Sequence, residues 1–169
     1  MPQITQNTDI TRKSCQTRFS TEEAHMLVST ILADKGADVV TVSPEQDVQG
    51  LLTLLAQHKV GALVVSHNGT TIDGIVSERD IVRALAAGES LMSEPVSRIM
   101  TSEVFVSTMH AKIDELMTVM TSQRIRHIPI TTDSGELIGI VSIGDLIKAR
   151  LSELEAEKEA LVDYITHGG

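Results

Sequence analysis

The stretch GIVSERDIVR (residues 74–83) decides the fold of this chain, because it recurs as GIVSIGDLIK at residues 139–148. Both copies keep a glycine, an apolar pair, a serine and, three residues after the serine, an aspartate. An apolar, β-branched run that leads directly into an amphipathic pattern is typical of a strand followed by a helix. We therefore expect a strand–helix unit that occurs twice in one chain.

The repeat extends on both sides of this stretch, so that residues 40–85 align with residues 104–150. In each copy, four apolar residues at i, i+3, i+4 and i+7 predict an amphipathic helix. Two apolar strands follow, joined by the polar turns HNGT and TDSGE, which are typical of hairpins. Each copy is thus predicted to run strand, helix, strand, strand, helix, and two such small units should pack face to face to bury enough surface. The helical positions are Val48, Leu51, Leu52 and Leu55, then Ile113, Leu116, Met117 and Met120.

A further helix is predicted ahead of the first copy. Residues 21–35 carry an apolar stripe, with Ser20 or Thr21 as the N-cap and Gly36 as the end of the helix. The polar residues before it are expected to form a flexible leader. The predicted division of the chain is a leader (1–20), the helix with the first repeat (21–92), the second repeat (93–150) and a helical extension (151–169).

The last helix is predicted to run from Ile143 to Thr166, because neither glycine nor proline interrupts this segment after Gly144. It carries an apolar stripe that either covers the domain or meets a second subunit. The stripe consists of Ile147, Leu151, Leu154, Leu161 and Ile165, with Lys158 inside it.

The composition excludes several classes of function. The chain of 169 residues has a formal net charge of −9, which disfavours nucleic acid as a partner because basic clusters supply most of that affinity. No apolar run approaches the roughly 20 residues of a membrane span, and the polar first segment does not resemble a signal peptide. We therefore expect a cytoplasmic protein with no membrane partner. Cys15 is the single cysteine and the histidines lack metal-ligand spacing, so no metal site is expected.

The repeated serine and aspartate have two interpretations. In the first, Ser77 with Asp80, and Ser142 with Asp145, are capping boxes that only begin helices. In the second, the helix N-terminus and the serine hydroxyl bind a phosphate, while the aspartate accepts hydrogen bonds from ribose hydroxyls. With no Trp, one Tyr and two Phe in the chain, a base bound here is expected to rest on aliphatic side chains.

The pattern RIRHIPI through GELIGIVSIGDLIK, with KVGALVV through GIVSERDIV one repeat earlier, resembles a tandem pair of CBS domains over about residues 37–150. The resemblance implies an α/β (α+β) fold of two βαββα units related by pseudo-twofold symmetry. It implies adenosine-containing ligands, such as AMP, ATP or NAD(H), in the clefts between the units. It also implies a flat homodimer.

The resemblance assigns roles to the repeated motif residues. By position, Asp80 and Asp145 would bind ribose, and Ser77 and Ser142 would bind phosphate. These four residues place one ligand site in each repeat, so the resemblance implies two nucleotide sites per chain.

The resemblance also assigns roles to the segment RHIP of the second copy. Arg126 and His127 would reach the phosphates, Ile128 would flank the adenine, and Pro129 completes the pattern. The first copy lacks the basic pair and the proline, and Arg79 would supply the phosphate charge there instead. The two sites are therefore expected to differ. From the residues alone, the charged pair and the proline also fit an exposed strand edge.

Three functions remain open at this point. The first is a small sensor without catalysis that binds an adenine nucleotide and signals through its dimer interface to an unidentified regulated protein. The second is a ligand-independent dimerisation or scaffold protein. The third is a redox or metal responder built on Cys15 and the scattered histidines. An enzyme is not expected, because the sequence has neither a nucleophile elbow nor a Walker loop.

Overall fold

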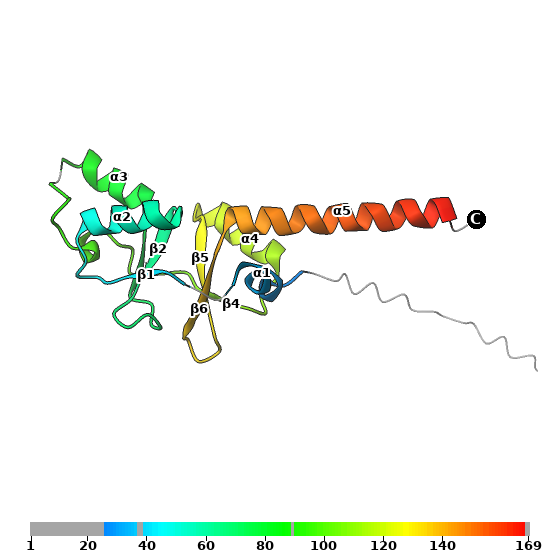
Figure 1. The fold of residues 1–169 in the computed structure, drawn as a ribbon, viewed down its shortest axis with the longest axis horizontal. Coiled ribbons are helices and arrows are strands. Elements are labelled where there is room, and N and C mark those ends of the chain that lie inside the picture. The colour runs from blue at the N-terminus through cyan, green and yellow to red at the C-terminus, as the bar shows by residue number, and fades with distance from the viewer. Residues whose placement is uncertain (1–25, 37–38, 89, 168–169) are drawn as a thin grey trace, which may run out of the picture.

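The computed structural model describes residues 26–36, 39–88 and 90–167. Within these residues the chain forms two similar units, each with a three-stranded sheet, that lie side by side (Figure 1). The first unit contains β1 (Thr41–Val42), α2 (Val48–His58), β2 (Ala62–Val65), β3 (Gly74–Ser77) and α3 (Glu78–Ala86). The second unit contains β4 (Ser107–Thr108), α4 (Ile113–Gln123), β5 (His127–Thr131), β6 (Leu137–Ser142) and α5 (Ile143–His167). The predicted order of elements is confirmed in both copies.

The two sheets have the same topology. Their strand orders are β1-β2-β3 and β4-β5-β6, with a parallel pair followed by an antiparallel pair in each. Because β5 is the central strand of its sheet, the interpretation of the segment around Pro129 as an exposed edge is wrong. The short strand β4 runs parallel to β5 and pairs with Ile130 and Thr131, so it begins just after Pro129, which has no N–H to donate.

The predicted helical stripes face the two cores. In α2 the residues Val48, Leu51 and Leu55 are buried, and Leu52 packs at the edge of the same core. In α4 the stripe repeats this arrangement with Ile113, Leu116 and Met120 buried and Met117 at the edge. Each sheet is therefore covered by a helix whose apolar period was visible in the sequence.

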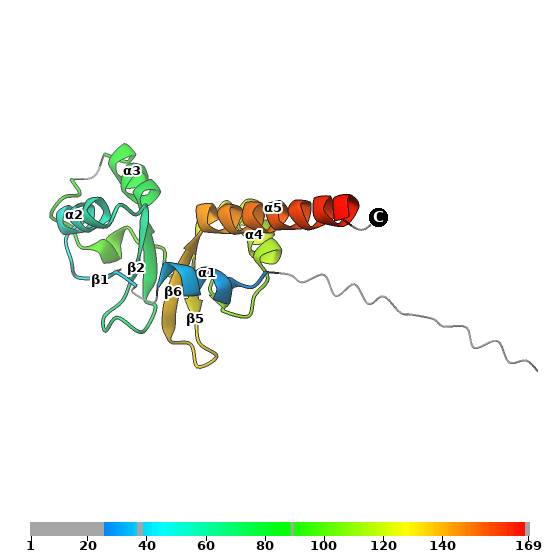
Figure 2. The same ribbon diagram turned by 45° about the vertical axis from the view of Figure 1, so that its right-hand side comes forward.

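Helix α1 (Val28–Lys35) packs on the second unit, although it precedes the first unit in the sequence (Figures 1 and 2). Val28 and Ile31 are buried in the core of the second unit. Conversely, Leu91 and Val96, in the segment that contains the 3₁₀ helix η1 (Val96–Arg98), are buried in the core of the first unit. Each unit thus completes its core with the segment that precedes the other unit, so the cores are not divided at residue 92.

Helix α1 begins at Val28, later than predicted. Leu27 forms a bridge with Lys112 and has an extended backbone, which fixes the entry to the helix. The predicted start at Thr21, its cap and the leader lie outside the described residues. Gly36 ends the helix as predicted, with a φ of 86° that favours glycine.

The glycine that opens each copy of the repeated stretch has a steric role. A Cβ at Gly74 would lie 2.8 Å from Sδ of Met100 and 2.9 Å from the carbonyl oxygen of Thr101. A Cβ at Gly139 would lie 2.5 Å from Cδ2 of Leu32. In both units, the segment that precedes the other unit in the sequence passes close to the sheet at a glycine, where no side chain is in the way.

Helix α5 confirms the predicted long final helix. Leu146, near its start, is fully buried, whereas Leu151, Leu161 and Ile165 are more than half exposed. The distal part of α5 projects beyond both units in both views (Figures 1 and 2). The alternative that its apolar stripe covers the domain is therefore wrong. None of the described helices is both long enough and apolar enough to cross a membrane.

Candidate ligand-binding cleft

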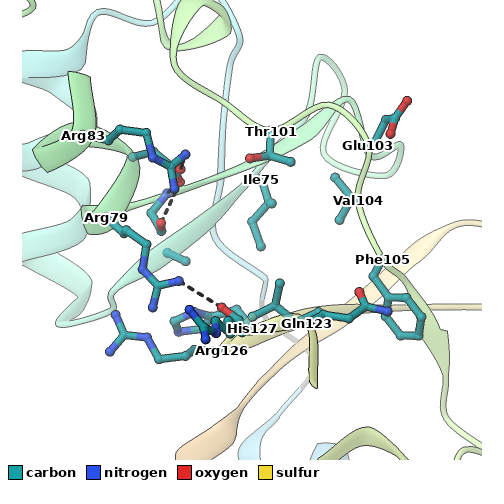
Figure 3. Close-up of a pocket in the computed structure, with 15 residues that line it drawn as sticks. Ile75, Arg79, Arg83, Thr101, Glu103, Val104, Phe105, Gln123, Arg126 and His127 are labelled. Carbon is teal, nitrogen blue, oxygen red and sulfur yellow. Dashed lines mark hydrogen bonds and ion pairs between the residues drawn. The ribbon is translucent and has the colours of Figure 1, made fainter. Parts of the chain in front are cut away.

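A cleft with a volume of about 380 Å³ opens between the two units. Its lining comes from β3 and the start of α3 in the first unit, the chain between η1 and β4, and the end of α4 with the start of β5, together with Ala62 at the start of β2 (Figure 3). The cleft therefore contains side chains from both repeats.

Asp80 is part of the N-terminal cap of α3, at one wall of this cleft. Its Oδ2 accepts hydrogen bonds from the backbone N of Ser77 at 2.9 Å and from the Ser77 Oγ at 2.6 Å. Its Oδ1 lies 3.4 Å from Nη1 of Arg83. The predicted capping box is confirmed here. A cap does not exclude a ligand, because Ser77 and Asp80 also line the cleft.

Basic side chains crowd one side of the cleft. Nη1 of Arg79, on α3, donates to the carbonyl oxygen of Arg124, at the end of α4, at 2.9 Å and so joins the two units. Arg83, Arg126 and His127 also line the cleft, against only two carboxylates in its lining. In a chain whose net charge is −9, this local excess of positive charge favours an anionic ligand.

The opposite side of the cleft is largely apolar. Figure 3 shows Ile75, Thr101 and Val104 across the hollow from the basic side chains. Phe105 also lines the cleft and is 39% exposed. A flat base bound in the cleft would therefore contact one aromatic side chain, Phe105. The sequence had predicted contacts with aliphatic side chains only.

The cleft brings together residues that the sequence analysis had divided between two sites. The residues of the predicted set that line it are Ser77, Arg79, Asp80, Arg126 and His127, whereas Ile128, Pro129, Ser142 and Asp145 do not. Arg126 and His127 thus lie with the serine and aspartate of the other repeat. Ile128 is fully buried in the second core, because successive side chains of β5 alternate between faces. Ile128 therefore does not line this cleft, and its contact with an adenine stays a prediction.

Sequence reasoning missed several residues of the cleft. Arg83 could have been predicted from the sequence, because it lies one helical turn after Asp80 and should share its face of the helix. Arg124 adopts a left-handed backbone with φ of 57° at the end of α4, as Lys59 does with 54° at the end of α2. Thr101 and Val104 lie between the repeats, and their place in the cleft depends on how the units pack.

In the second unit, Lys35 of α1 binds the aspartate that corresponds to Asp80. Oδ2 of Asp145 accepts hydrogen bonds from the backbone N and Oγ of Ser142, both at 2.8 Å, and from Nζ of Lys35 at 2.9 Å. Burial acts to raise the pKa of Asp145, but the hydrogen bonds from Lys35 and Ser142 outweigh it and hold the pKa below its usual value. This carboxylate is therefore charged and already paired.

The side chain of Lys35 makes a hydrogen bond that corresponds to one made by the backbone of Thr101 in the first unit. The backbone N and O of Thr101 each pair with the backbone of Ile75 at 2.9 Å. Nζ of Lys35 donates at 3.2 Å to the carbonyl oxygen of Ile140, the counterpart of Ile75. The hollow beside this ion pair measures about 260 Å³ and lies between α1 and α5.

The second unit lacks most of the basic side chains that line the first cleft, although Lys148 stands where the first cleft has Arg83. The strand registers equate β2 with β5 and β3 with β6, so the counterparts of each cleft residue can be identified. Gly61, Ala62 and Gly144 stand where the first cleft has Arg126, His127 and Arg79. The two clefts therefore differ in charge.

His127 lines the first cleft, and charges of both units act on its pKa. Burial lowers its pKa, and the positive charges of Arg126 and Lys35 lower it further, against the opposing effect of Asp145 and Glu78. The folded protein therefore keeps this imidazole neutral at a pH where the unfolded chain has begun to bind a proton. An anionic ligand beside His127 would favour the protonated ring.

The lowered pKa of His127 predicts a loss of stability on acidification. Below the unfolded-state pKa of about 6.5, the unfolded chain binds more protons at this site than the folded one, so the free energy of unfolding falls as pH decreases. The His127→Gln variant should lose less stability than the wild type between about pH 7.5 and 5.5 in urea titrations. Equal losses in the two proteins would contradict the assignment.

The third function left open by the sequence was a redox or metal responder that uses Cys15 and the scattered histidines. Cys15 lies outside the described residues. Among the residues that the structure describes, no three or more His, Cys, Asp or Glu side chains are grouped so that they could hold a metal ion.

Comparisons with known proteins agree with the fold and with the resemblance. The family model of the CBS domain matches residues 28–87 and 96–152. The CBS domain-containing protein CBSX3, mitochondrial, of Arabidopsis thaliana is 34% identical over 171 residues, covering 91% of this chain and 82% of the relative. The crystal structure of the CBS-domain containing protein ATU1752 from Agrobacterium tumefaciens has a TM-score of 0.70 at 40% identity, covering 74% of this chain and 99% of that one. The crystal structure of CBSX2 in complex with AMP has a TM-score of 0.60 and covers 68% of this chain and 90% of that chain; at 22% identity it shares the fold alone.

Proposed function

Because the chain belongs to the CBS-domain family, we propose that it is a regulatory module that binds an adenine nucleotide, of the AMP, ATP or NAD(H) type, and has no catalysis of its own. One observation carries this proposal: the Ser77–Asp80 helix start of one repeat and the Arg126–His127 pair of the other line the same cleft. A fold that also occurs in complex with AMP supports the choice of ligand class.

The cleft offers complementary chemistry for each part of a nucleotide. Asp80 is an acceptor for ribose hydroxyls, since a carboxylate can take several hydrogen bonds. Arg79 and Arg126 are donors for phosphate oxygens, and their planar groups suit bidentate contacts. Ile75 and Val104 provide apolar surface for the base.

The composite cleft also gives a route from binding to signalling. A ligand that contacts both units would favour the arrangement of the units that it binds more tightly, and the population would shift by that difference in affinity. We propose that a homodimer passes this shift to a regulated protein in the cytoplasm. Neither nucleic acid nor a membrane is proposed as a partner.

A scaffold without a ligand is the second candidate function. The observation that favours it is the cap itself: Oδ2 of Asp80 is occupied by the N–H and hydroxyl of Ser77. If the cleft never binds a nucleotide, the repeated motif is explained by its role in starting helices.

Thermal unfolding in the presence of nucleotides separates the two candidates. Protein confirmed to be ligand-free would be heated with AMP, ADP, ATP, NAD, NADH, GTP and S-adenosylmethionine. A ligand at about 100 times its Kd adds roughly 2.7 kcal/mol, which raises the midpoint by roughly 5 to 10 °C at about 2 to 4 °C per kcal/mol.

Two matched variants locate the site. Asp80→Ala and Asp145→Ala each remove a helix cap, but only Asp80→Ala is expected to abolish the midpoint shift. A shift that survives in both variants would argue against this cleft as the site. If none of the ligands shifts the wild type, the scaffold function takes its place.

A further inference from the structure

The exposed stripe of α5 has the spacing of a coiled-coil seam. Ile147, Leu151, Leu154, Leu161 and Ile165 follow one another along a single face, and the exposed fraction of these side chains ranges from 44% to 77%. The intervals alternate between four and three residues when Lys158 is counted as a member. This average of about 3.5 residues is the period of two helices that wind around each other.

The residue types on the seam favour a two-stranded assembly. Leu151, Lys158 and Ile165 take the a positions, and Ile147, Leu154 and Leu161 take the d positions. Leucine at two of the three d positions and isoleucine at one a position are typical of dimers, whereas Leu151 at a and Ile147 at d are not. A single lysine at an a position selects register and oligomeric state at some cost in stability.

The charges beside the seam favour two parallel helices. In a parallel pair, Arg150 at a g position faces the partner's Glu155 at the following e position, an attractive contact. At its a position Lys158 would face the partner's Lys158 across the seam, and the partner's Glu157 at the neighbouring g position would supply a counter-ion. In the antiparallel register that keeps the same apolar layers together, Glu155 faces the partner's Glu155 and Glu157 faces the partner's Glu157. Those like charges oppose the antiparallel arrangement.

The same charges argue against other occupants of the stripe. Glu155 and Glu157 flank the seam at e and g positions, and Glu153, Glu159 and Asp163 lie on the outer face of the same helix. These acidic side chains would repel an anionic membrane surface. The helix does not have to nucleate on association, since its first turns are anchored on the second unit by Leu146.

We infer that residues 147–165 of α5 form a parallel two-stranded coiled coil with the same residues of a second copy of this chain. The seam begins beside the second unit and continues along the projecting part of α5 (Figure 1), and none of its residues lines the cleft that contains Asp80. The inference does not depend on the identity of the nucleotide. Arg150 is shared in this arrangement, because it also pairs with Glu153 of its own helix and lies 3.8 Å from Asp114.

Sedimentation equilibrium of the full chain over a range of concentrations tests the seam. The double variant Leu154→Glu/Leu161→Glu is expected to raise the Kd of the dimer at least tenfold, and Lys158→Ile is expected to lower it. The control Ala156→Glu/Ala160→Glu adds the same charge at exposed positions off the seam and should leave the Kd within about twofold of the wild type. Equal Kd values for all four proteins would overturn the inference, as would a trimer.

Cross-linking tests the orientation. In a Cys15→Ser background, Leu161→Cys should form a disulfide-linked dimer under mild oxidation, because the d positions of parallel helices face each other. An antiparallel pair would place residue 161 opposite residue 151 and give little homodimeric disulfide. Failure of Leu161→Cys to cross-link, in a protein that still associates, would overturn the parallel coiled coil.

Discussion

Replacing Arg126 with glutamate is expected to weaken the binding of ATP about a hundredfold and to leave the free energy of unfolding nearly unchanged. The side chain of Arg126 is exposed at the mouth of the cleft, and within the described residues it makes no hydrogen bond or ion pair, whereas its backbone carbonyl accepts from the N–H of Ile143 at 2.9 Å. A hydrogen bond to a charged group is worth about 1.5–3 kcal/mol, or about 10- to 150-fold in affinity, and the reversed charge adds repulsion. Titration calorimetry measures the affinity, and urea unfolding measures the stability.

Lys148→Glu is the matched control for Arg126→Glu. It makes the same change of charge at the position in the second unit that corresponds to Arg83, and it is equally exposed. ATP should bind this variant within about threefold of the wild type. If both variants lose affinity equally, the effect comes from the net charge of the protein and the role of Arg126 in the cleft is wrong.

Truncating Lys35 to alanine is expected to raise the number of nucleotides bound per chain from about one to about two. In the wild type, Nζ of Lys35 occupies Asp145 Oδ2 and the carbonyl oxygen of Ile140, the groups whose counterparts line the first cleft. Removal of the side chain frees the carboxylate for ribose hydroxyls. The new site should be the weaker one, because Gly61 and Ala62 stand where the first cleft has basic side chains. Calorimetric titration to high ligand concentration measures the stoichiometry.

Lys35→Met separates charge from volume in this prediction. Methionine keeps most of the side-chain length without a donor, so the second site should stay obstructed in Lys35→Met and open in Lys35→Ala. The ion pair is partly exposed, with side-chain exposures of 44% for Lys35 and 26% for Asp145, so its loss should cost at most about 1 kcal/mol of stability. An unchanged stoichiometry in Lys35→Ala would show that Lys35 does not limit the second site.

The local structure could be predicted because its signals are local. The stripe of α2, the hairpin turns and the junction of β3 with α3 each depend on residues within a few positions of one another. The same holds for the end of α1 at Gly36. Errors arose where a partner from elsewhere in the chain decides the outcome: α1 begins at Val28 because residue 27 pairs with Lys112.

The composition of the site could be predicted only in part. The serines and aspartates were recognisable because each pair is a short motif. Their association with Arg126 and His127 of the other repeat follows from how two sheets pack, and no spacing within one repeat encodes it. The burial of Ile128 follows from the alternation of β5 once His127 is known to face the cleft. The pairing of Lys35 with Asp145 depends on the exchange of α1 between units.

That exchange sets an order of events during synthesis. Helix α1 leaves the ribosome before any part of the surface that it covers, and Val28 and Ile31 have no core to enter until α4 and β5 have followed. The first unit, in contrast, takes Leu91 and Val96 from the chain directly after α3 and can close early. In the nascent chain the apolar side chains of α1 therefore stay exposed beside the folded first unit until translation has passed Leu146. A chaperone that binds exposed apolar segments would protect the chain most during this period.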